Sequence, residues 1–367
     1  MKDARENIPN PTTNLTEAVK AFSSFLGRLE RSRQVVCLHD SDADGITAGV
    51  IWELAMKRLG FEQAARVLPT RERNAWADST KVIVKKAAPD FLFVLDMGSQ
   101  PEAIIENVPV CFVDHHRPGG VLSTDTLISA YLWDPVPNTS LIVYDLFAAL
   151  TTMENLDWIA AIGIMSDLGE RAPFALLGET KKKYTAKYLK EATALVNASR
   201  RSANYEPEIA AQALLKHHNP KELVNSDFAE VQRLYEYRAE VKAALDEAKK
   251  AAPKFAGNVA LLRLNSPCQI HPLIAQIWRS RLPPKFIVIA ANEGYLPGKV
   301  NFSARSHSSV NALEFLRSIK LEVRDGSYAN GHDQATGGSL PPETWNELLE
   351  KLGFTAAEFA QAQPNPR

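Results

Sequence analysis

Cysteine is scarce in this sequence, and the few cysteines lie far apart. There are three, Cys37, Cys111 and Cys268, and no two of them form a CxxC pair. An odd, scattered set of this kind is typical of a reduced cytosolic protein and argues against a disulfide framework or a thiolate zinc site. Long apolar runs are lacking too, since residues 286–291 are only strand-length and residues 1–14 lack the apolar core of a signal peptide. We therefore expect a soluble, cytoplasmic protein.

Net charge is also nearly absent. The 42 Lys and Arg residues are balanced by 43 Asp and Glu residues, which leaves a formal charge of −1. This balance argues against a protein that coats long nucleic acid by bulk electrostatics, but it leaves a local basic groove open. Hydrophobic residues make up 45% of the 367 residues, which is close to the globular average, so extensive disorder is not expected.

The first half of the sequence alternates short apolar segments with helical ones. An amphipathic helix is expected at 14–30, strands at 34–38, 65–69, 90–96 and 109–114, and a further helix at 46–60. This alternation predicts an α/β fold with a parallel sheet. From about residue 140 the pattern turns helical, and α/β character returns after residue 255.

These patterns predict three parts of the chain. A parallel-sheet domain with an N-terminal helix takes residues 1–170, a helical connector takes 171–254, and a smaller α/β domain takes 255–367. Within the connector, residues 180–201 carry seven Lys and Arg residues against one acid, a local charge of +6. We interpret this run as a solvated helix face, which is the usual setting of such charge runs.

The densest polar feature is the motif HDSDADG at residues 39–45, directly after the first expected strand. Its three carboxylates, at alternate positions, repel one another unless a cation compensates them. A calcium loop of the EF-hand type needs a Glu that residues 46–52 lack. A purely structural acid cluster is the other alternative. We favour a hard-metal site at the carboxyl end of a strand.

Similar residues follow two further expected strands. One strand ends in Asp96, the next is followed by Asp114-His115-His116, and a fourth acid, Asp167, follows an apolar helical run. Because the carboxyl ends of parallel strands share one edge, we expect these side chains to meet in one crevice. Mixed carboxylate and imidazole ligands suit Mn²⁺ best and Mg²⁺ second, with Zn²⁺ or Co²⁺ as further options. The expected metal ligands are Asp42, Asp44, Asp96, His115 and Asp167, a number that suits two ions about 3.5–4 Å apart.

Four segments resemble the ordered motifs of the DHH phosphoesterase superfamily: HDSDADGITAG, LDMGS, VDHHRPGG and GIMSDLG. The resemblance implies a two-metal, usually Mn²⁺-dependent hydrolase of phosphodiesters or phosphoanhydrides. The first motif is similar to that of RecJ-type single-strand exonucleases and their archaeal relatives. The segment VLPTRER at 67–73 also resembles the Pro-x-Arg element of the family, with Arg71 as the matching arginine.

The far end of the chain resembles the first type of DHH-associated C-terminal domain. NFSARSH at 301–307, VNALEFL and GHDQATGG at 331–338 are similar to its Ser-x-Arg strand, helix and glycine-rich loop. An arginine offers a fork for a phosphate, and glycines let backbone N–H groups approach a nucleotide closely. The substrate-binding residues that the resemblance implies are Arg305, His332, Gly331, Gly337, Gly338, Ser303 and Arg71, with Asn301 in support.

The resemblance also implies roles within the first motifs. Asp44 and Asp96 would bridge the two metals, and His116 would contact the scissile phosphate. Asp114 would orient an imidazole, and Asp40 would complete one metal shell or hold water. Whether His39 is a metal ligand or an ordinary loop residue stays open.

Taken together, the sequence predicts a phosphodiesterase that cleaves single-stranded DNA or RNA, or short oligonucleotides, exonucleolytically with Mn²⁺, Mg²⁺ or Co²⁺. The sequence leaves open whether the substrate is DNA or RNA, from which end it is cleaved and whether the protein forms a homodimer. The near alternative is a cyclic-dinucleotide or nano-oligonucleotide phosphodiesterase, although such enzymes tend to carry an HxNPDGDA motif instead. Polyphosphate hydrolysis is disfavoured because those relatives resemble a different C-terminal domain. A non-catalytic DHH scaffold would have lost metal ligands that are all present here.

Overall fold

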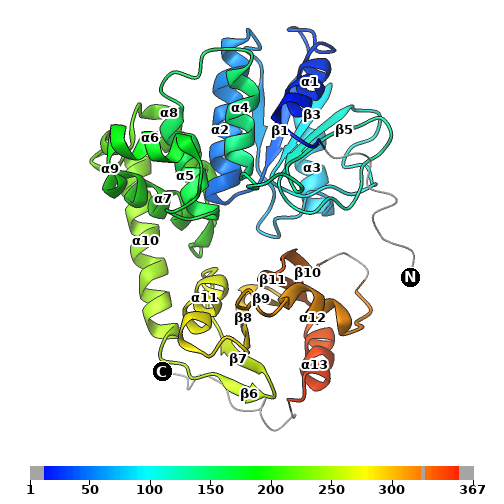
Figure 1. Cartoon of the computed structure of the whole chain (residues 1–367), viewed down its shortest axis with the longest axis vertical. Coiled ribbons are helices and arrows are strands. Elements are labelled where there is room, and N and C mark those ends of the chain that lie inside the picture. The colour runs from blue at the N-terminus through cyan, green and yellow to red at the C-terminus, as the bar shows by residue number, and fades with distance from the viewer. Residues whose placement is uncertain (1–11, 324–326, 355–367) are drawn as a thin grey trace. The chain divides into compact units, whose positions relative to one another are not determined.

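The computed structural model describes residues 12–323 and 327–354, which form two compact units (Figure 1). The first unit contains the residues up to Arg200 together with Asn204–Arg238, and the second contains Arg201–Ala203 and the residues from Ala239 onward. Each helix within the described ranges is too short or too polar to cross a membrane.

A five-stranded parallel sheet in the order β2-β1-β3-β4-β5 forms the centre of the first unit. Its strands are β1 (Val35–His39), β2 (Ala65–Val67), β3 (Phe91–Leu95), β4 (Val110–Asp114) and β5 (Thr126–Ser129). Of the four expected strands, β1, β3 and β4 are buried, and they are apolar apart from the last residue of β1 and of β4, because the sheet is covered on both faces. The predicted α/β fold with a parallel sheet is confirmed, and β5 is a strand that the sequence pattern did not reveal.

Helices cover both faces of this sheet (Figure 1). Alternate residues of β3 point to opposite faces, so that Phe93 packs with the helices on one side and Val94 packs with α3 on the other. The helices of this part are α1 (Leu15–Leu26), α2 (Ala43–Arg58), α3 (Asp78–Ala87), α4 (Thr139–Ala148) and α5 (Asp157–Asp167). Helix α2 packs closely against both α4 and α5, so the three form one buried layer.

Most of residues 171–254 pack into the first unit. The helices there are α6 (Ala175–Tyr184), α7 (Ala186–Arg201), α8 (Pro207–Lys216), α9 (Pro220–Val224) and α10 (Ala229–Ala248). Leu177, Leu195 and Leu214 are buried in the same core as the sheet and α2, so these helices extend the first unit. The expected connector is therefore divided, because α10 belongs to the first unit as far as Arg238 and to the second unit after it.

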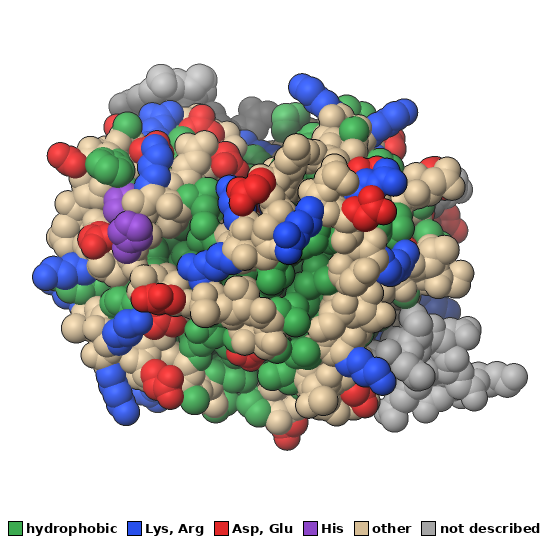
Figure 2. Space-filling view, turned by 90° about the horizontal axis from the view of Figure 1, so that it is seen from above, with side chains coloured by type: hydrophobic (Ala, Val, Ile, Leu, Met, Phe, Trp, Pro, Cys, Tyr) green, Lys and Arg blue, Asp and Glu red, His purple; other side chains and the backbone are tan. Residues whose placement is uncertain are grey.

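Three of the seven basic residues at 180–201 lie beside acids of their own unit. Lys183 pairs with Asp157 at 2.9 Å, Lys190 pairs with Glu170 at 2.7 Å, and Arg200 lies 3.8 Å from Asp42. On the face of the molecule shown in Figure 2, acidic and basic side chains are interspersed. This distribution fits the balanced composition of the chain.

The second unit is built on a six-stranded mixed sheet in the order β10-β11-β9-β8-β7-β6. Its elements are β6 (Lys254–Ala256), β7 (Val259–Leu264), α11 (His271–Arg281), β8 (Ile287–Leu296), β9 (Lys299–Arg305), α12 (Ala312–Ser318), β10 (Tyr328–His332), β11 (Ala335–Leu340) and α13 (Pro342–Lys351). Strands β7 and β8 pair in parallel, whereas their described neighbours pair antiparallel. Helices α12 and α13 cover the face that Phe302 enters.

A carboxylate of α4 makes the stability of the first unit depend on pH. Burial raises the pKa of Asp145 to about 6, whereas an unfolded aspartate titrates near 3.9. Above pH 6 the folded protein must bury a charge that the unfolded chain exposes to water, and below about pH 4 both states are protonated. We expect Asp145→Asn to stabilise the protein by about 1–2 kcal/mol at pH 8, after allowance for its partial exposure, and very little at pH 4. Urea unfolding at the two pH values measures this.

The exposed Asp227→Asn variant is the matched control, and its effect should be small and independent of pH. An equal gain from Asp145→Asn at both pH values would show that burial of the charge is not the cause.

Candidate metal centre

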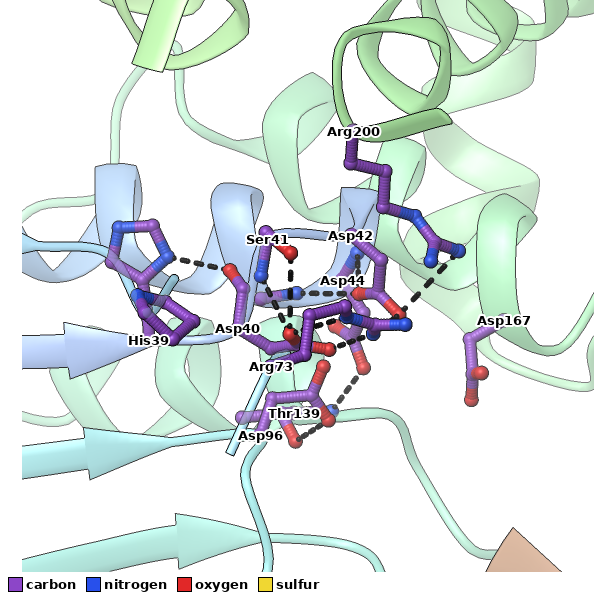
Figure 3. A network of polar contacts seen from close by, with 12 residues as sticks. His39, Asp40, Ser41, Asp42, Asp44, Arg73, Asp96, Thr139, Asp167 and Arg200 are labelled. Atoms are coloured by element: carbon purple, nitrogen blue, oxygen red, sulfur yellow. Dashed lines mark hydrogen bonds and ion pairs between the residues drawn. The ribbon is translucent and has the colours of Figure 1, made fainter. Parts of the chain in front are cut away.

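Three neighbouring strands deliver polar side chains to the carboxyl edge of the parallel sheet (Figure 3). Asp40 follows β1, Asp96 follows β3, and Asp114 ends β4. Strand β3 pairs with β1 on one side and with β4 on the other, so the three carboxylates meet at one edge. Asp42 and Asp44 join them from the start of α2, where Asp42 is the N-cap residue.

All the residues predicted as metal ligands or as catalytic groups meet at this edge. Their ligand atoms form three overlapping groups, within each of which the atoms lie within 4.8 Å of one another. The groups are Asp40, Asp42 and Asp96; Asp44, His115 and Asp167; and Asp96, Asp114, His115 and His116. Carboxylate oxygens with one or two imidazoles fit hard or borderline divalent cations such as Mg²⁺ and Mn²⁺.

His115 lies at the centre of the cluster and is almost fully buried. Its Nε2 is 3.4 Å from Asp96 Oδ1, 3.7 Å from Asp167 Oδ2 and 3.8 Å from Asp44 Oδ2. One imidazole nitrogen therefore faces three carboxylates from three different elements. The imidazole nitrogen and the three carboxylate oxygens are thus already close enough together to be ligands of one cation.

His39 takes no part in the cluster, and Figure 3 shows its ring apart from the carboxylates of Asp42, Asp44 and Asp96. Its Nδ1 lies 2.8 Å from the Asp40 carbonyl oxygen, and its Nε2 lies 3.3 Å from Arg66 Nη1. Burial, together with the charge of Arg66, lowers the pKa of His39 to about 3. The side chain is thus a neutral packing residue behind the first motif.

The N-terminus of α4 holds Asp44 in place. The Asp44 carboxylate accepts hydrogen bonds from the Asn138 side chain at 2.6 Å, from Thr139 N at 3.0 Å and from Ser140 N at 2.7 Å. The Thr139 hydroxyl donates to Asp96 Oδ1 at 3.0 Å. Backbone N–H groups at a helix start favour a negative charge, so α4 stabilises and orients two of the central carboxylates.

The central carboxyl groups are nevertheless buried too close together to ionise readily. Burial raises the pKa of Asp44 and that of Asp96 well above the usual range, and neighbouring carboxylates raise both further. Burial also raises the pKa of Asp167, although the charge of His115 opposes the rise. A group of acids that resists ionisation in this way is suited to a bound cation, because the cation would supply the charge that the protein lacks there.

Asp114 and His116 form a hydrogen-bonded pair beside the central group. Asp114 Oδ1 accepts from His116 N at 2.6 Å and lies 2.7 Å from His116 Nδ1, while Oδ2 accepts from Gly98 N at 2.6 Å. Burial alone would lower the pKa of His116, but the charge of Asp114 raises it to about 9. His116 is therefore a cation at neutral pH, and its side chain is one-third exposed.

Two arginines flank the other side of the cluster, and the sequence patterns had not singled them out. Arg73 donates from Nε to Asp40 Oδ1 at 2.9 Å and from Nη2 to Asp42 Oδ2 at 3.0 Å, and Arg200 lies 3.8 Å from the same Asp42 oxygen. Burial raises the pKa of Asp42, but the charges of Arg200 and Arg73 outweigh it and hold that pKa well below its usual range. Arg73, which lies two residues beyond the predicted substrate residue Arg71, thus contacts the acids of the first motif.

Residues 34–165, from the segment before β1 into the last turn of α5, match the DHH family, N-terminal domain. This segment is a DHH domain. It contains the first three of the four predicted motifs, whereas Asp167 lies just beyond its end and Arg200 lies further along the chain, in α7.

The curated proteins that match this chain are described as single-stranded-DNA-specific exonucleases RecJ. The single-stranded-DNA-specific exonuclease RecJ of Dickeya dadantii is 24% identical over 179 residues, which cover 45% of this chain and 31% of the relative. The RecJ of Escherichia coli is 26% identical over 132 residues, which cover 34% of this chain and 23% of the relative. These matches therefore span less than a third of the relatives.

Solved structures with the same fold extend the likeness over nearly the whole chain. RecJ of Thermus thermophilus in complex with Mn²⁺ gives a TM-score of 0.68 at 20% identity and covers 98% of this chain and 57% of that one. A DHH domain described as that of a member of the s1p family of ribosomal proteins gives a TM-score of 0.67 at 14% identity. The match covers 96% of this chain and 94% of that domain. At these identities the shared property is the fold.

The predicted substrate residues outside the DHH domain lie on the second sheet. Alternation along β9 places Asn301, Ser303 and Arg305 on one face, and Arg305 Nη1 donates to Ser303 Oγ at 2.7 Å. Burial lowers the pKa of Arg305 to about 10, helped by the charge of Arg279. Asn301 Oδ1 is buried and has no hydrogen-bond partner among the described residues. This face therefore offers polar atoms for a ligand.

The glycine-rich segment of the second unit turns out to be a β-hairpin. Gly331 and His332 belong to β10, and His332 is exposed. A Cβ at Gly338 would lie 2.9 Å from the Phe302 ring, and one at Gly337 would lie 2.4 Å from the Phe302 carbonyl oxygen. The close pairing of β11 with β9 thus leaves no room for a side chain at Gly337 or Gly338. This explains the two glycines independently of the predicted contact with a nucleotide.

Proposed function

We propose that this protein is a metal-dependent phosphodiesterase that removes nucleotides from an end of single-stranded nucleic acid or of short oligonucleotides. The observation that carries the proposal is the meeting of carboxylates and imidazoles at one sheet edge, in groups whose ligand atoms lie within 4.8 Å of one another. The DHH domain supports it, as do relatives described as single-stranded-DNA-specific exonucleases. The buried, crowded acids are hard to explain in a protein that binds no cation.

Two divalent cations, Mn²⁺ foremost with Mg²⁺ or Co²⁺ as substitutes, would be held by Asp42, Asp44, Asp96, His115 and Asp167. When bound, such ions activate water and neutralise the charge that develops on a phosphate during hydrolysis. The chain prepares the ligands for this task. Helix α4 fixes Asp44, and Thr139 fixes Asp96, so their oxygens already point into the crevice before an ion arrives.

His116 would bind a non-bridging oxygen of the scissile phosphate. Its raised pKa keeps the ring protonated at neutral pH, and Asp114 fixes its orientation through Nδ1. Gly98 N and His116 N in turn fix Asp114. These contacts therefore keep the His116 ring protonated and oriented. The ring can bind the phosphate without reorganisation of the protein.

The second unit would bind the terminal nucleotide. Arg305 offers a guanidinium to a phosphate, and Ser303 holds that guanidinium by accepting one of its N–H groups. The unpaired Asn301 Oδ1 on the same face would accept a hydrogen bond from a ligand. His332, Gly331, Gly337 and Gly338 would border the nucleotide, and Arg71 of the first unit would contact the backbone of the substrate.

A digestion series tests the proposal. DNA and RNA labelled at either end, from dinucleotides to 30-mers, and cyclic dinucleotides would be incubated with Mn²⁺, with a chelator and with no metal. We expect Mn²⁺-dependent, stepwise release of mononucleotides, and a loss of at least about a hundredfold in His116→Ala, because the phosphate loses a cationic partner. The exposed His218→Ala variant, in the loop between α8 and α9, should match the wild type.

Two other outcomes would redirect the assignment. Cleavage confined to cyclic or two-residue substrates would make the protein a nucleotide-recycling or signalling phosphodiesterase. Absence of metal-dependent cleavage of every substrate, together with absence of Mn²⁺ binding, would leave only a scaffold role.

A further inference from the structure

We propose that Arg73 is an internal counter-ion that occupies one half of the metal centre and must leave before a second ion can bind. The proposal rests on the two-metal function above and adds an order of binding to it. The first ion would bind at the Asp44–His115–Asp167 group. The second would bind at the Asp40–Asp42–Asp96 group only by displacing the guanidinium.

The contacts of Arg73 carry this inference. Its guanidinium pairs with both oxygens of Asp40, through Nε at 2.9 Å and through Nη2, and the same Nη2 lies 3.0 Å from Asp42 Oδ2. Asp40 and Asp42 are also two of the three members of one metal-ligand group. The oxygens that a cation would use on this side are therefore already bound by a cation of the protein.

A guanidinium and a divalent ion cannot share these oxygens. Like charges at hydrogen-bond distance repel strongly even when water partly screens them. The two carboxylates can therefore neutralise either Arg73 or a metal ion. At the other end of the crevice, Asp44, Asp96 and Asp167 face His115, so an ion entering there meets three carboxylates gathered around an imidazole.

The position of Arg73 makes its departure feasible. It lies in the segment between β2 and α3, outside any helix or strand, and its side chain is 24% exposed. Arg200, by contrast, comes from α7, its side chain is 10% exposed, and its Nε donates to Asn197 Oδ1. Arg200 is therefore a fixed neighbour of Asp42, and Arg73 is the arginine that can swing out.

Manganese titration measures the proposed competition directly. In the wild type, calorimetry or Mn²⁺ electron paramagnetic resonance should resolve two sites of unequal affinity. In Arg73→Gln the weaker site should bind about tenfold more tightly, because a charge-assisted contact no longer has to be broken, while the stronger site changes less than about twofold. Arg33→Gln, which removes a surface pair with Asp90, is the matched control and should leave both affinities unchanged.

A second readout follows the guanidinium itself. Phenylglyoxal modification of Arg73, located by tandem mass spectrometry, should rise severalfold when Mn²⁺ is raised past the second binding step. Melting temperatures in chelator would show that the variants are folded. An unchanged or weakened second site in Arg73→Gln, or Arg73 labelling that does not respond to Mn²⁺, would overturn the proposal.

The two proposals fail in different ways. If Mn²⁺-dependent cleavage occurs while Arg73→Gln leaves the second affinity unchanged, the phosphodiesterase function stands and the counter-ion role is wrong. If neither cleavage nor Mn²⁺ binding is found in wild type or variant, both are wrong.

Discussion

Asp96→Asn is expected to slow hydrolysis about a thousandfold and yet to raise the melting temperature of the metal-free protein. The carboxylate would be a ligand of the ions, and a thousandfold loss corresponds to about 4 kcal/mol of transition-state stabilisation. The gain in stability has a different origin. Burial and the charge of Asp42 raise the pKa of Asp96, so the ionised carboxylate is unfavourable in the absence of a cation.

The substitution is well suited to this position. Asp96 has a φ of 62°, and asparagine tolerates the left-handed region better than other non-glycine residues. The asparagine Oδ1 can still accept the hydrogen bond that the Thr139 hydroxyl donates to Asp96. The variant therefore removes the charge while the local geometry is kept.

Three measurements check this expectation: the turnover number, the melting temperature in chelator and the melting temperature in Mn²⁺. Mn²⁺ should stabilise the wild type and have much less effect on Asp96→Asn. Asp246→Asn, on the exposed face of α10, should behave as wild type throughout. Activity within about tenfold of wild type would remove Asp96 from the ligand set, and a lower melting temperature in chelator would contradict the argument from repulsion.

Gly163→Ala is expected to destabilise the protein by about 3 kcal/mol and to weaken metal binding at the same time. A Cβ on Gly163 would lie 2.5 Å from Ser140 Cβ and 2.6 Å from Thr47 Oγ1, so α5 would have to move away from α4 and α2. Ser140 N is one of the donors to Asp44, so the movement would disturb the carboxylate as well.

Urea unfolding and Mn²⁺ titration of the same samples test both effects. Gly178→Ala in α6 is the matched control, because a Cβ there would meet nothing within 4 Å. In a helix with space around it, the exchange of Gly for Ala should stabilise the protein by up to about 1 kcal/mol. If Gly163→Ala were as mild as Gly178→Ala, the close packing of α2, α4 and α5 would not be what holds the centre together.

The acids of the site could be predicted from the sequence because their signals are local. A short apolar run followed by a polar residue marks a strand end, and Asp96 and Asp114 both follow such runs. Arg73 could not be found in this way, since its place depends on the path of a turn whose backbone adopts a positive φ. Arg200 reaches Asp42 only because α7 folds back onto the first unit, which no pattern near residue 200 reveals.

The helix start that holds Asp44 could be predicted from the sequence only in part. Asn138-Thr139-Ser140 has the composition of a helix N-terminus, so the beginning of α4 could have been expected. That its N–H groups meet Asp44, almost a hundred residues earlier, follows from the packing of α4 against α2. β5 escaped notice because TLIS is short and partly polar, and its pairing with β4 makes it a strand.

The path of the chain has a consequence for modularity. Residues 201–203 belong to the second unit although both flanking segments belong to the first, and Arg201 O accepts a hydrogen bond from Gln269 N. Helix α10 then carries the chain across once more. The two units are thus not independent modules, since division of the chain at any single position would leave part of one unit attached to the other. Recombination in evolution would have to exchange them together, and the metal centre would be inherited with the sheet that bears Arg305.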